Sequence, residues 1–353
     1  MNTIYENQIL ENKMTELIDT KLNTRAIMTL DTSLAENAGL RKVINRYTYE
    51  GSMENLEKGE KNTVKGTVSF VPEYYDVKRY QQTFEYNDMD AMADPYIVEV
   101  AMKGATNEIT NEINKEYFGE VAKISQRSYF DGESITYADI VDALAIIDTE
   151  VDDGLFIIMG AEGRKQIRKD ADFIASRQGE ILYTGQFGSL CGIPVIFSKL
   201  VKGSTVYVTN KDAVRFFIKK EASVEQARDI ETKDNTVVYE RHGLIALVDD
   251  TSSIKVGKRA NALAFEVEEN ASLSADEQIE AKVTVTKTGD SNKLYYAFNE
   301  LSPFAGESVP ASFTLMEKDT VIQPARHTVL CVVEADASGN TVAVGTYSFK
   351  TLL

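Results

Sequence analysis

The sequence lacks several features that define common classes of protein. It has two cysteines and two histidines among 353 residues. It contains no run of about 18 apolar residues, and its first ten residues lack the basic and apolar regions of a secretory signal. We therefore expect neither a membrane segment nor export by that route. Basic residues number 38 against 55 acidic ones, a formal net charge of -17, which argues against tight wrapping by nucleic acid.

The scarcity of chemically reactive side chains also argues against an enzyme. His242 and His327 lie in different regions, and neither stands in a metal-ligand spacing. The sequence has no phosphate-binding Gly-Lys-Ser/Thr motif, no Gly-x-Ser-x-Gly motif and no paired Cys and His. Asp152-Asp153 and Asp249-Asp250 are interpreted as solvated turn residues. We expect no catalytic residue, no cofactor and no metal.

Cys191 and Cys331 are far apart, and each lies in an apolar stretch. This placement predicts two buried free thiols in different domains.

The strongest pattern that is present predicts one long amphipathic helix from Asp94 to Lys123. Asp94 is a suitable N-cap and Pro95 a suitable first residue. Apolar residues recur near a period of 3.6, which predicts one packed face. These residues are Ile97, Ala101, Ala105, Ile109, Ile113, Phe118 and Val121.

An extended arm, residues 47–80, precedes this helix. Its short strand-like stretches are separated by glycines, and its tip from Glu54 to Lys65 is almost wholly charged or polar. A hairpin with so little apolar surface is marginal alone in water, so we expect it to lie across an adjacent subunit. A solvated loop is the alternative. The charged residues expected to contact a neighbour are Glu57, Lys58, Glu60, Lys61, Lys65 and Arg79.

Elements on either side of these two segments are also predicted. A helical arm is expected over Glu6–Leu22, either docked on its own chain or clasping another subunit. After the long helix, helix, strand and helix follow at Thr136–Thr149, Leu155–Met159 and Ala161–Phe173, which indicates a mixed α/β layer. Further strands are expected at Ile181–Phe187, Val206–Thr209 and Ala213–Ile218, with a last hairpin formed by Val237–Arg241 and Leu244–Val248.

This order of parts resembles the major capsid proteins of tailed bacteriophages, which have the Hong Kong 97-type fold. The resemblance covers roughly residues 30–259 and includes a moderately specific Gly-x-Leu-x-Gly-x-Pro-Val pattern. The residues that match this pattern are Gly188, Leu190, Gly192, Pro194 and Val195.

The resemblance implies an α+β chain divided as follows: an N-terminal arm (1–46), an extended loop (47–80), a peripheral domain (81–135) with the spine helix 94–123, a mainly axial domain (136–235), and strands that return to the peripheral domain (236–260). It implies self-assembly into hexamers and pentamers of an icosahedral head that encloses double-stranded DNA without sequence-specific contact. It also implies a portal and, because few residues precede the match, a separate scaffolding protein. The location implied is the virion capsid, assembled in the bacterial cytoplasm. No covalent Lys-to-Asn isopeptide crosslink between subunits is predicted.

Residues 261–353 differ in character, with short alternating segments rich in β-branched residues and separated by turn signals. Strands at this spacing predict an added immunoglobulin-like all-β sandwich. We interpret it as a surface decoration that reinforces the lattice, attaches to glycans or a host surface, or is a passive appendage. Three readings compete with the phage head: a non-viral compartment shell, a cell-surface binding protein with an immunoglobulin-like module, and an unrecognised hydrolase.

Overall fold

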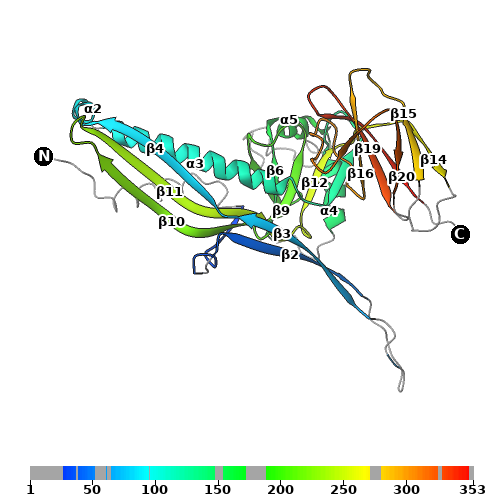
Figure 1. The fold of residues 1–353 in the computed structure, drawn as a ribbon, viewed down its shortest axis with the longest axis horizontal. Helices are drawn as coiled ribbons and strands as arrows, with labels where there is room; N and C mark the ends of the chain where they lie inside the picture. Colours follow the sequence, from blue (N-terminus) through cyan, green and yellow to red (C-terminus); the bar gives the residue numbers. More distant parts are fainter. Residues whose placement is uncertain are drawn as a thin grey trace.

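The chain forms a long, thin part and two compact parts (Figure 1). The computed structural model describes residues 27–36, 39–51, 61, 65–94, 96–147, 154–171, 188–270, 280–324 and 328–349. A long sheet with its helix occupies one end, a second sheet lies in the middle, and the C-terminal strands lie at the other end. Within the described ranges, no helix is long and apolar enough to span a bilayer.

The long part is a four-stranded sheet against which helix α3 (Ile97–Val121) packs. Strands β10 and β11 form an antiparallel pair along its length, from Val214 opposite Leu247 to Arg228 opposite Asn235. Side chains of α3, β10 and β11 share one core. In spatial order the strands are β1 (Thr29–Asp31), β10 (Val214–Arg228), β11 (Asp234–Leu247) and β4 (Lys78–Asn87).

The long helix is present but begins three residues later than the predicted 94. A short helix, α2 (Asp88–Ala93), precedes it, and Asp94 ends α2 in an extended conformation (φ -136°, ψ 100°). Asp94 precedes Pro95 in the sequence, and a residue before proline is disfavoured in the helical region. In the first turns Val98 and Met102 are buried in place of Ile97 and Ala101, whereas Ala105, Ile109, Ile113 and Val121 are buried as predicted.

The middle part is a six-stranded sheet with helices α4 (Tyr137–Ile147) and α5 (Ala161–Lys169). Its core joins both helices to the central strands. The strand predicted at Leu155–Met159 is β6, with the predicted bounds and every residue buried. In spatial order the strands are β5 (Arg127–Phe130), β12 (Ile254–Lys258), β9 (Val206–Asn210), β6, β8 (Ile193–Phe197) and β7 (Ser189–Leu190).

The division between these two sheets differs from the one implied by the resemblance. Strand β10, which starts at Val214, already belongs to the long sheet, so the return begins well before the expected residue 236. Strand β12 then goes back to the six-stranded sheet, where it pairs in parallel with β5. The resemblance instead implies that β5, within residues 81–135, belongs to the peripheral domain.

The predicted hairpin of Val237–Arg241 and Leu244–Val248 is wrong. Apart from Val248, both segments lie in the single strand β11, and Gly243 continues the strand without a turn. A Cβ at Gly243 would lie 2.6 Å from the ring of Phe216, so the glycine is required by close packing in the sheet.

A two-stranded hairpin projects from the middle of the molecule (Figure 1). It consists of β2 (Arg41–Glu50) and β3 (Thr67–Asp76). It therefore begins and ends earlier than the expected 47–80.

The C-terminal region, from residue 261, contains two sheets that share one core. Strand β18 was not predicted from the sequence. One sheet contains β13 (Asn261–Ala262), β20 (Thr341–Ser348), β19 (Val329–Ala335), β16 (Lys293–Phe298) and β17 (Thr314–Met316), and the other contains β14 (Phe265–Asn270), β15 (Glu280–Val285) and β18 (Asp319–Ile322).

Several predictions fall outside the described residues. These are the helix at Glu6–Leu22, the strand at Ile181–Phe187, the pair Asp152-Asp153, and His327.

Candidate intersubunit surface

The β2–β3 hairpin has two distinct faces because side chains alternate along each strand. Its register pairs Arg41 with Asp76 and Tyr47 with Phe70. The face that turns toward the long sheet is here called the inner face, and it includes Ile44 and Tyr75. The opposite face is called the outer face. Its large apolar side chains are Val43, Tyr47, Val68, Phe70 and Tyr74, and the same face also carries Asn45, Pro72 and the ion pair of Arg41 with Asp76.

The inner face is packed where the hairpin leaves the molecule. Ile44 and Tyr75 are 7% and 8% exposed and share a small core with Phe217 and Leu244. The Tyr75 hydroxyl donates to Glu120 Oε2 of α3 at 3.1 Å. Burial, together with the neighbouring carboxylates of Glu120 and Glu73, raises the pKa of Tyr75, so this hydroxyl stays protonated and can donate. Contacts within the chain thus fix the orientation of the hairpin at its base.

Ion pairs reinforce this base. Arg46 NH2 lies 2.6 Å from Glu73 Oε2, and its NH1 lies 3.6 Å from Asp250 Oδ2. Lys123, just after α3, contacts Glu73 at 3.5 Å. These half-buried pairs connect the hairpin to both α3 and the segment after β11.

The apolar side chains of the outer face are exposed. Val43, Tyr47, Val68, Phe70 and Tyr74 are 46%, 66%, 59%, 57% and 62% exposed. They are neighbours across the two strands, and the rings of Tyr47 and Phe70 lie 6.0 Å apart. Several large apolar side chains exposed on a projecting ribbon are typical of a surface that another molecule covers.

The charged residues predicted from the sequence occupy different places. Lys61 and Lys65 are described and exposed near the end of the hairpin. Arg79 is not in the hairpin: it lies in β4, opposite His242 of β11. Glu57, Lys58 and Glu60 lie outside the described residues.

Sequence reasoning missed the outer face. The available signal was in β3, where Phe70-Val71 and Tyr74-Tyr75 place bulky side chains on both faces. A strand that is apolar on both faces is typical of one covered on both sides.

The family-like motif forms a two-residue turn between β7 and β8. Cys191 and Gly192, the two turn residues, both have positive φ, at 52° and 84°. A turn of this kind requires left-handed backbone at both positions, which explains the glycine. Leu190 and Ile193 flank the turn and are buried, and the Val195 N–H donates to Gly188 O at 2.9 Å. The motif therefore shapes one edge of the six-stranded sheet. The prediction of two buried thiols is correct for Cys331 and wrong for Cys191, which is half-buried in this turn.

The remaining Asp pair is a structural turn. Asp249 Oδ1 accepts from the Thr251 N–H at 3.0 Å, and Asp250 Oδ2 accepts from the Ser125 N–H at 3.2 Å. Across the part of the chain that the structure describes, no three His, Cys, Asp or Glu side chains are grouped so as to hold a metal ion.

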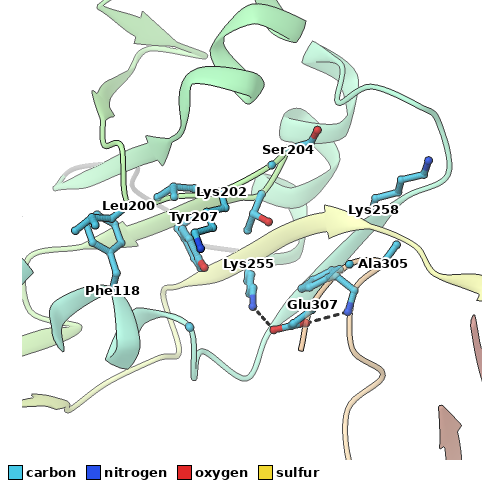
Figure 2. Close-up of a pocket in the computed structure, with 15 residues that line it drawn as sticks. Phe118, Leu200, Lys202, Ser204, Tyr207, Lys255, Lys258, Ala305 and Glu307 are labelled. Atoms are coloured by element: carbon cyan, nitrogen blue, oxygen red, sulfur yellow. Dashed lines mark hydrogen bonds and ion pairs between the residues drawn. The ribbon is translucent and has the colours of Figure 1, made fainter. Parts of the chain in front are cut away.

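A second connection joins the six-stranded sheet to the C-terminal region (Figure 2). Lys255 of β12 projects toward Glu307, and its Nζ lies 2.5 Å from Glu307 Oε1. Arg127 of β5 lies 3.4 Å from the other carboxylate oxygen and donates to Ser302 O at 2.9 Å. Burial raises the pKa of Glu307, but Lys255 and Arg127 outweigh it and hold the pKa below its ordinary value. We call Arg127, Lys255 and Glu307 the anchor.

Apolar packing surrounds the anchor. Phe304 is 3% exposed, and the centroid of its ring lies 4.9 Å from that of the Tyr129 ring. A Cβ at Gly257 would lie 2.6 Å from the Phe304 ring. Beside the anchor is a cleft of about 470 Å³ between the two regions, lined in part by Lys202 and Ser204.

Comparisons with known proteins agree with this architecture. No protein-family model matches the chain. The major capsid protein of Staphylococcus phage phiMR11 is 19% identical over 264 residues, which cover 72% of this chain and 94% of that protein. The capsid of a native GTA particle is similar with a TM-score of 0.53 at 10% identity, covering 67% of this chain and 89% of that one. The capsid of the cyanophage P-SCSP1u is similar with a TM-score of 0.51 at 12% identity, covering 66% and 86%. The chain therefore has the fold found in these capsids.

Proposed function

We propose that this chain is a structural major capsid protein whose copies form the shell of a phage head. The outer face of the β2–β3 hairpin carries the proposal, since five apolar side chains project from a ribbon that a single copy leaves uncovered. The capsid fold and the phage relative support the same role. The role is structural and not catalytic.

In this proposal the hairpin of one copy lies on a neighbouring copy. The packed inner face fixes the direction of the ribbon, so that little conformational freedom is lost when the outer face docks. Burial of apolar area supplies the main stabilisation. The charged side chains of Glu57, Lys58, Glu60, Lys61 and Lys65 would add contacts worth only ~0.2–1 kcal/mol each.

The finer assembly is proposed from the resemblance to the Hong Kong 97-type fold. Copies form pentamers and hexamers of an icosahedral head that encloses double-stranded DNA, with a portal and a separate scaffolding protein. Assembly takes place in the bacterial cytoplasm. The long sheet with α3 corresponds to the peripheral domain and the six-stranded sheet to the axial domain.

The C-terminal region is proposed to be an immunoglobulin-like sandwich on the capsid surface. Two sheets around one core support this assignment. The anchor would hold the region in a fixed orientation on the subunit, as lattice reinforcement requires. Attachment to glycans or a host surface is the alternative role for this region.

A non-viral compartment shell is the second candidate function, because the same outer face would serve any closed shell. Neighbouring genes separate the two: a portal or scaffold gene favours the phage head, and a cargo enzyme gene favours the compartment.

Negative-stain electron microscopy of the purified protein, expressed with and without its neighbouring genes, tests the proposal. We expect closed shells or capsomer rings from the unmodified chain. Tyr47→Ser with Phe70→Ser should abolish them, whereas Leu315→Ser with Val321→Ser, at similarly exposed C-terminal positions, should not. A protein that stays monomeric under every condition would refute the proposal.

A further inference from the structure

Helix α5 carries a basic groove on an otherwise acidic chain. The groove, a cavity of about 410 Å³ between α5 and the end of β8, has four basic residues and no acidic residue in its lining. The chain as a whole has a formal net charge of -17, so the groove reverses the average sign. Its lining residues are Ala161, Arg164, Lys165, Arg168, Phe197, Ser198 and Lys199.

The position of Arg164 is fixed by its surroundings. Arg164 and Arg168 are four residues apart and so lie on one face of α5. The Arg164 guanidinium lies over the Phe197 ring, 4.4 Å from its centroid. Its Nε is buried and has no hydrogen-bond partner among the described residues. Lys165, by contrast, is paired with Glu162 at 3.0 Å. Stacking therefore orients a guanidinium whose Nε–H has no partner among the described residues.

The beginning of α5 adds potential of the same sign. The helix starts without a side-chain cap, and a Cβ at the N-cap residue Gly160 would lie 2.2 Å from Val201 O. Only glycine fits there, so no capping side chain can cover the first N–H groups. Ala161, the first helical residue, lines the groove. Ser198 Oγ accepts from the Leu200 N–H at 3.2 Å, which leaves its O–H as a donor.

We infer that this groove binds phosphate groups of a nucleic-acid backbone. Arginine forks and helix N-termini both match phosphate oxygens, and stacked arginine is well suited to phosphate recognition. The inference rests on the proposed function for its source of DNA, because a filled shell brings phosphates to its inner surface at high concentration. In the view of Figure 1, α5 lies on the upper edge of the molecule, while the hairpin projects from the lower edge. Phosphate binding and subunit docking thus use separate surfaces.

The test uses two double variants. The α5 variant carries both Arg164→Gln and Arg168→Gln, and the matched control on α3 carries both Lys103→Gln and Lys115→Gln. The control removes the same charge from exposed helical positions. Binding of a fluorescent random-sequence DNA duplex to each full-length protein is followed by anisotropy over a series of salt concentrations. We expect the α5 variant to bind at least about tenfold more weakly and its salt slope to shrink by ~2, one for each lost phosphate contact. The control should match the unmodified chain.

Inorganic phosphate as the competitor distinguishes a backbone site from a site for the free ion. Tight binding of the duplex that inorganic phosphate displaces only weakly supports the inference. Binding of inorganic phosphate without binding of the duplex overturns it. Equal loss in the control, or unchanged DNA binding in the α5 variant, also overturns it. Loss of shells in the α5 variant with DNA binding intact would overturn the inference and indicate that these arginines act in assembly. Shell formation is read separately by microscopy, so failure of the proposed function is distinguishable.

Discussion

The anchor of the C-terminal region and the outer face of the hairpin differ in whether one copy of the chain satisfies them. At the anchor, Lys255 is 5% exposed and meets Glu307 at 2.5 Å, while Phe304 fills the space over Gly257. On the outer face, Tyr47 and Phe70 contact each other but are 66% and 57% exposed. The first surface is buried within a single chain, and a single chain leaves the second exposed.

We therefore expect the anchor to contribute to the stability of the single chain and the outer face to contribute to assembly. Substitutions at the anchor should change stability before assembly begins. Substitutions on the outer face should change assembly and leave the free chain intact.

The largest effect is expected at the anchor. Glu307→Ala leaves Lys255 and Arg127 buried without their carboxylate, and breaking a buried ion pair in this way costs ~3–5 kcal/mol. Urea unfolding of the unassembled chain should show this loss. Glu99→Ala, which breaks an exposed pair with Lys103, should cost ~0.5 kcal/mol or less. Equal costs for the two variants would contradict the account of the anchor.

A smaller effect is expected from crowding the same junction. Gly257→Ala would place a Cβ 2.6 Å from the Phe304 ring, and overpacking of this kind costs ~1–3 kcal/mol. Gly104→Ala, in the middle of α3 with nothing within 4 Å of the new Cβ, should instead stabilise by up to ~1 kcal/mol. Thermal unfolding midpoints that move in opposite directions would support the comparison. A Gly257→Ala variant as stable as the unmodified chain would show that Phe304 can move aside.

Acid should weaken the anchor. The folded pKa of Glu307 is held below its ordinary value of 4.5, so its contribution is present above that pH and is lost as pH falls through the folded pKa. Other carboxylates, including Asp88 and Glu240, have lowered pKa values too, so the test is a difference between two chains. Glu307→Gln should be less stable than the unmodified chain at neutral pH, and the gap should narrow as pH falls below 4.5. A gap independent of pH would contradict this.

The smallest effect on the free chain is expected at the outer face. Tyr47→Ser with Phe70→Ser removes side chains that are already exposed, so the free energy of unfolding of the unassembled chain should change by no more than ~0.5 kcal/mol per site. Circular dichroism during urea unfolding measures it. A loss as large as that of Glu307→Ala would mean that the outer face is packed within its own chain.

Local sequence patterns predicted most single elements well. The apolar run Leu155–Met159 is a buried strand, and the period of α3 is clear through Val121. The wrong predictions concern residue types that suit more than one local structure. The predicted hairpin needed a turn between Arg241 and Leu244, but Gly243 there allows the Phe216 ring to pack on β11. Asp94 was predicted to be an N-cap but ends α2.

The hairpin that carries the candidate surface was predicted near its observed position, but the apolar side chains of its outer face were not predicted. Its position followed from a hairpin too polar at its tip to be stable alone, whereas its apolar face depends on the register of β2 with β3. The anchor was not predictable, because Lys255 and Glu307 are brought together only when the C-terminal sheets dock. No local pattern marks a pair that is formed by tertiary structure.

The most direct test of the central claim is cysteine labelling at the outer face. Tyr47→Cys would be compared with Leu315→Cys, both in a Cys191→Ser background, in free protein and in assembled shells. Both positions are exposed in the single chain, at 66% and 62%, and Cys331 is buried. We predict that both label readily in free protein and that only position 47 becomes protected in shells. Equal labelling of position 47 in the two states would contradict the claim that the hairpin is completed by a neighbouring copy.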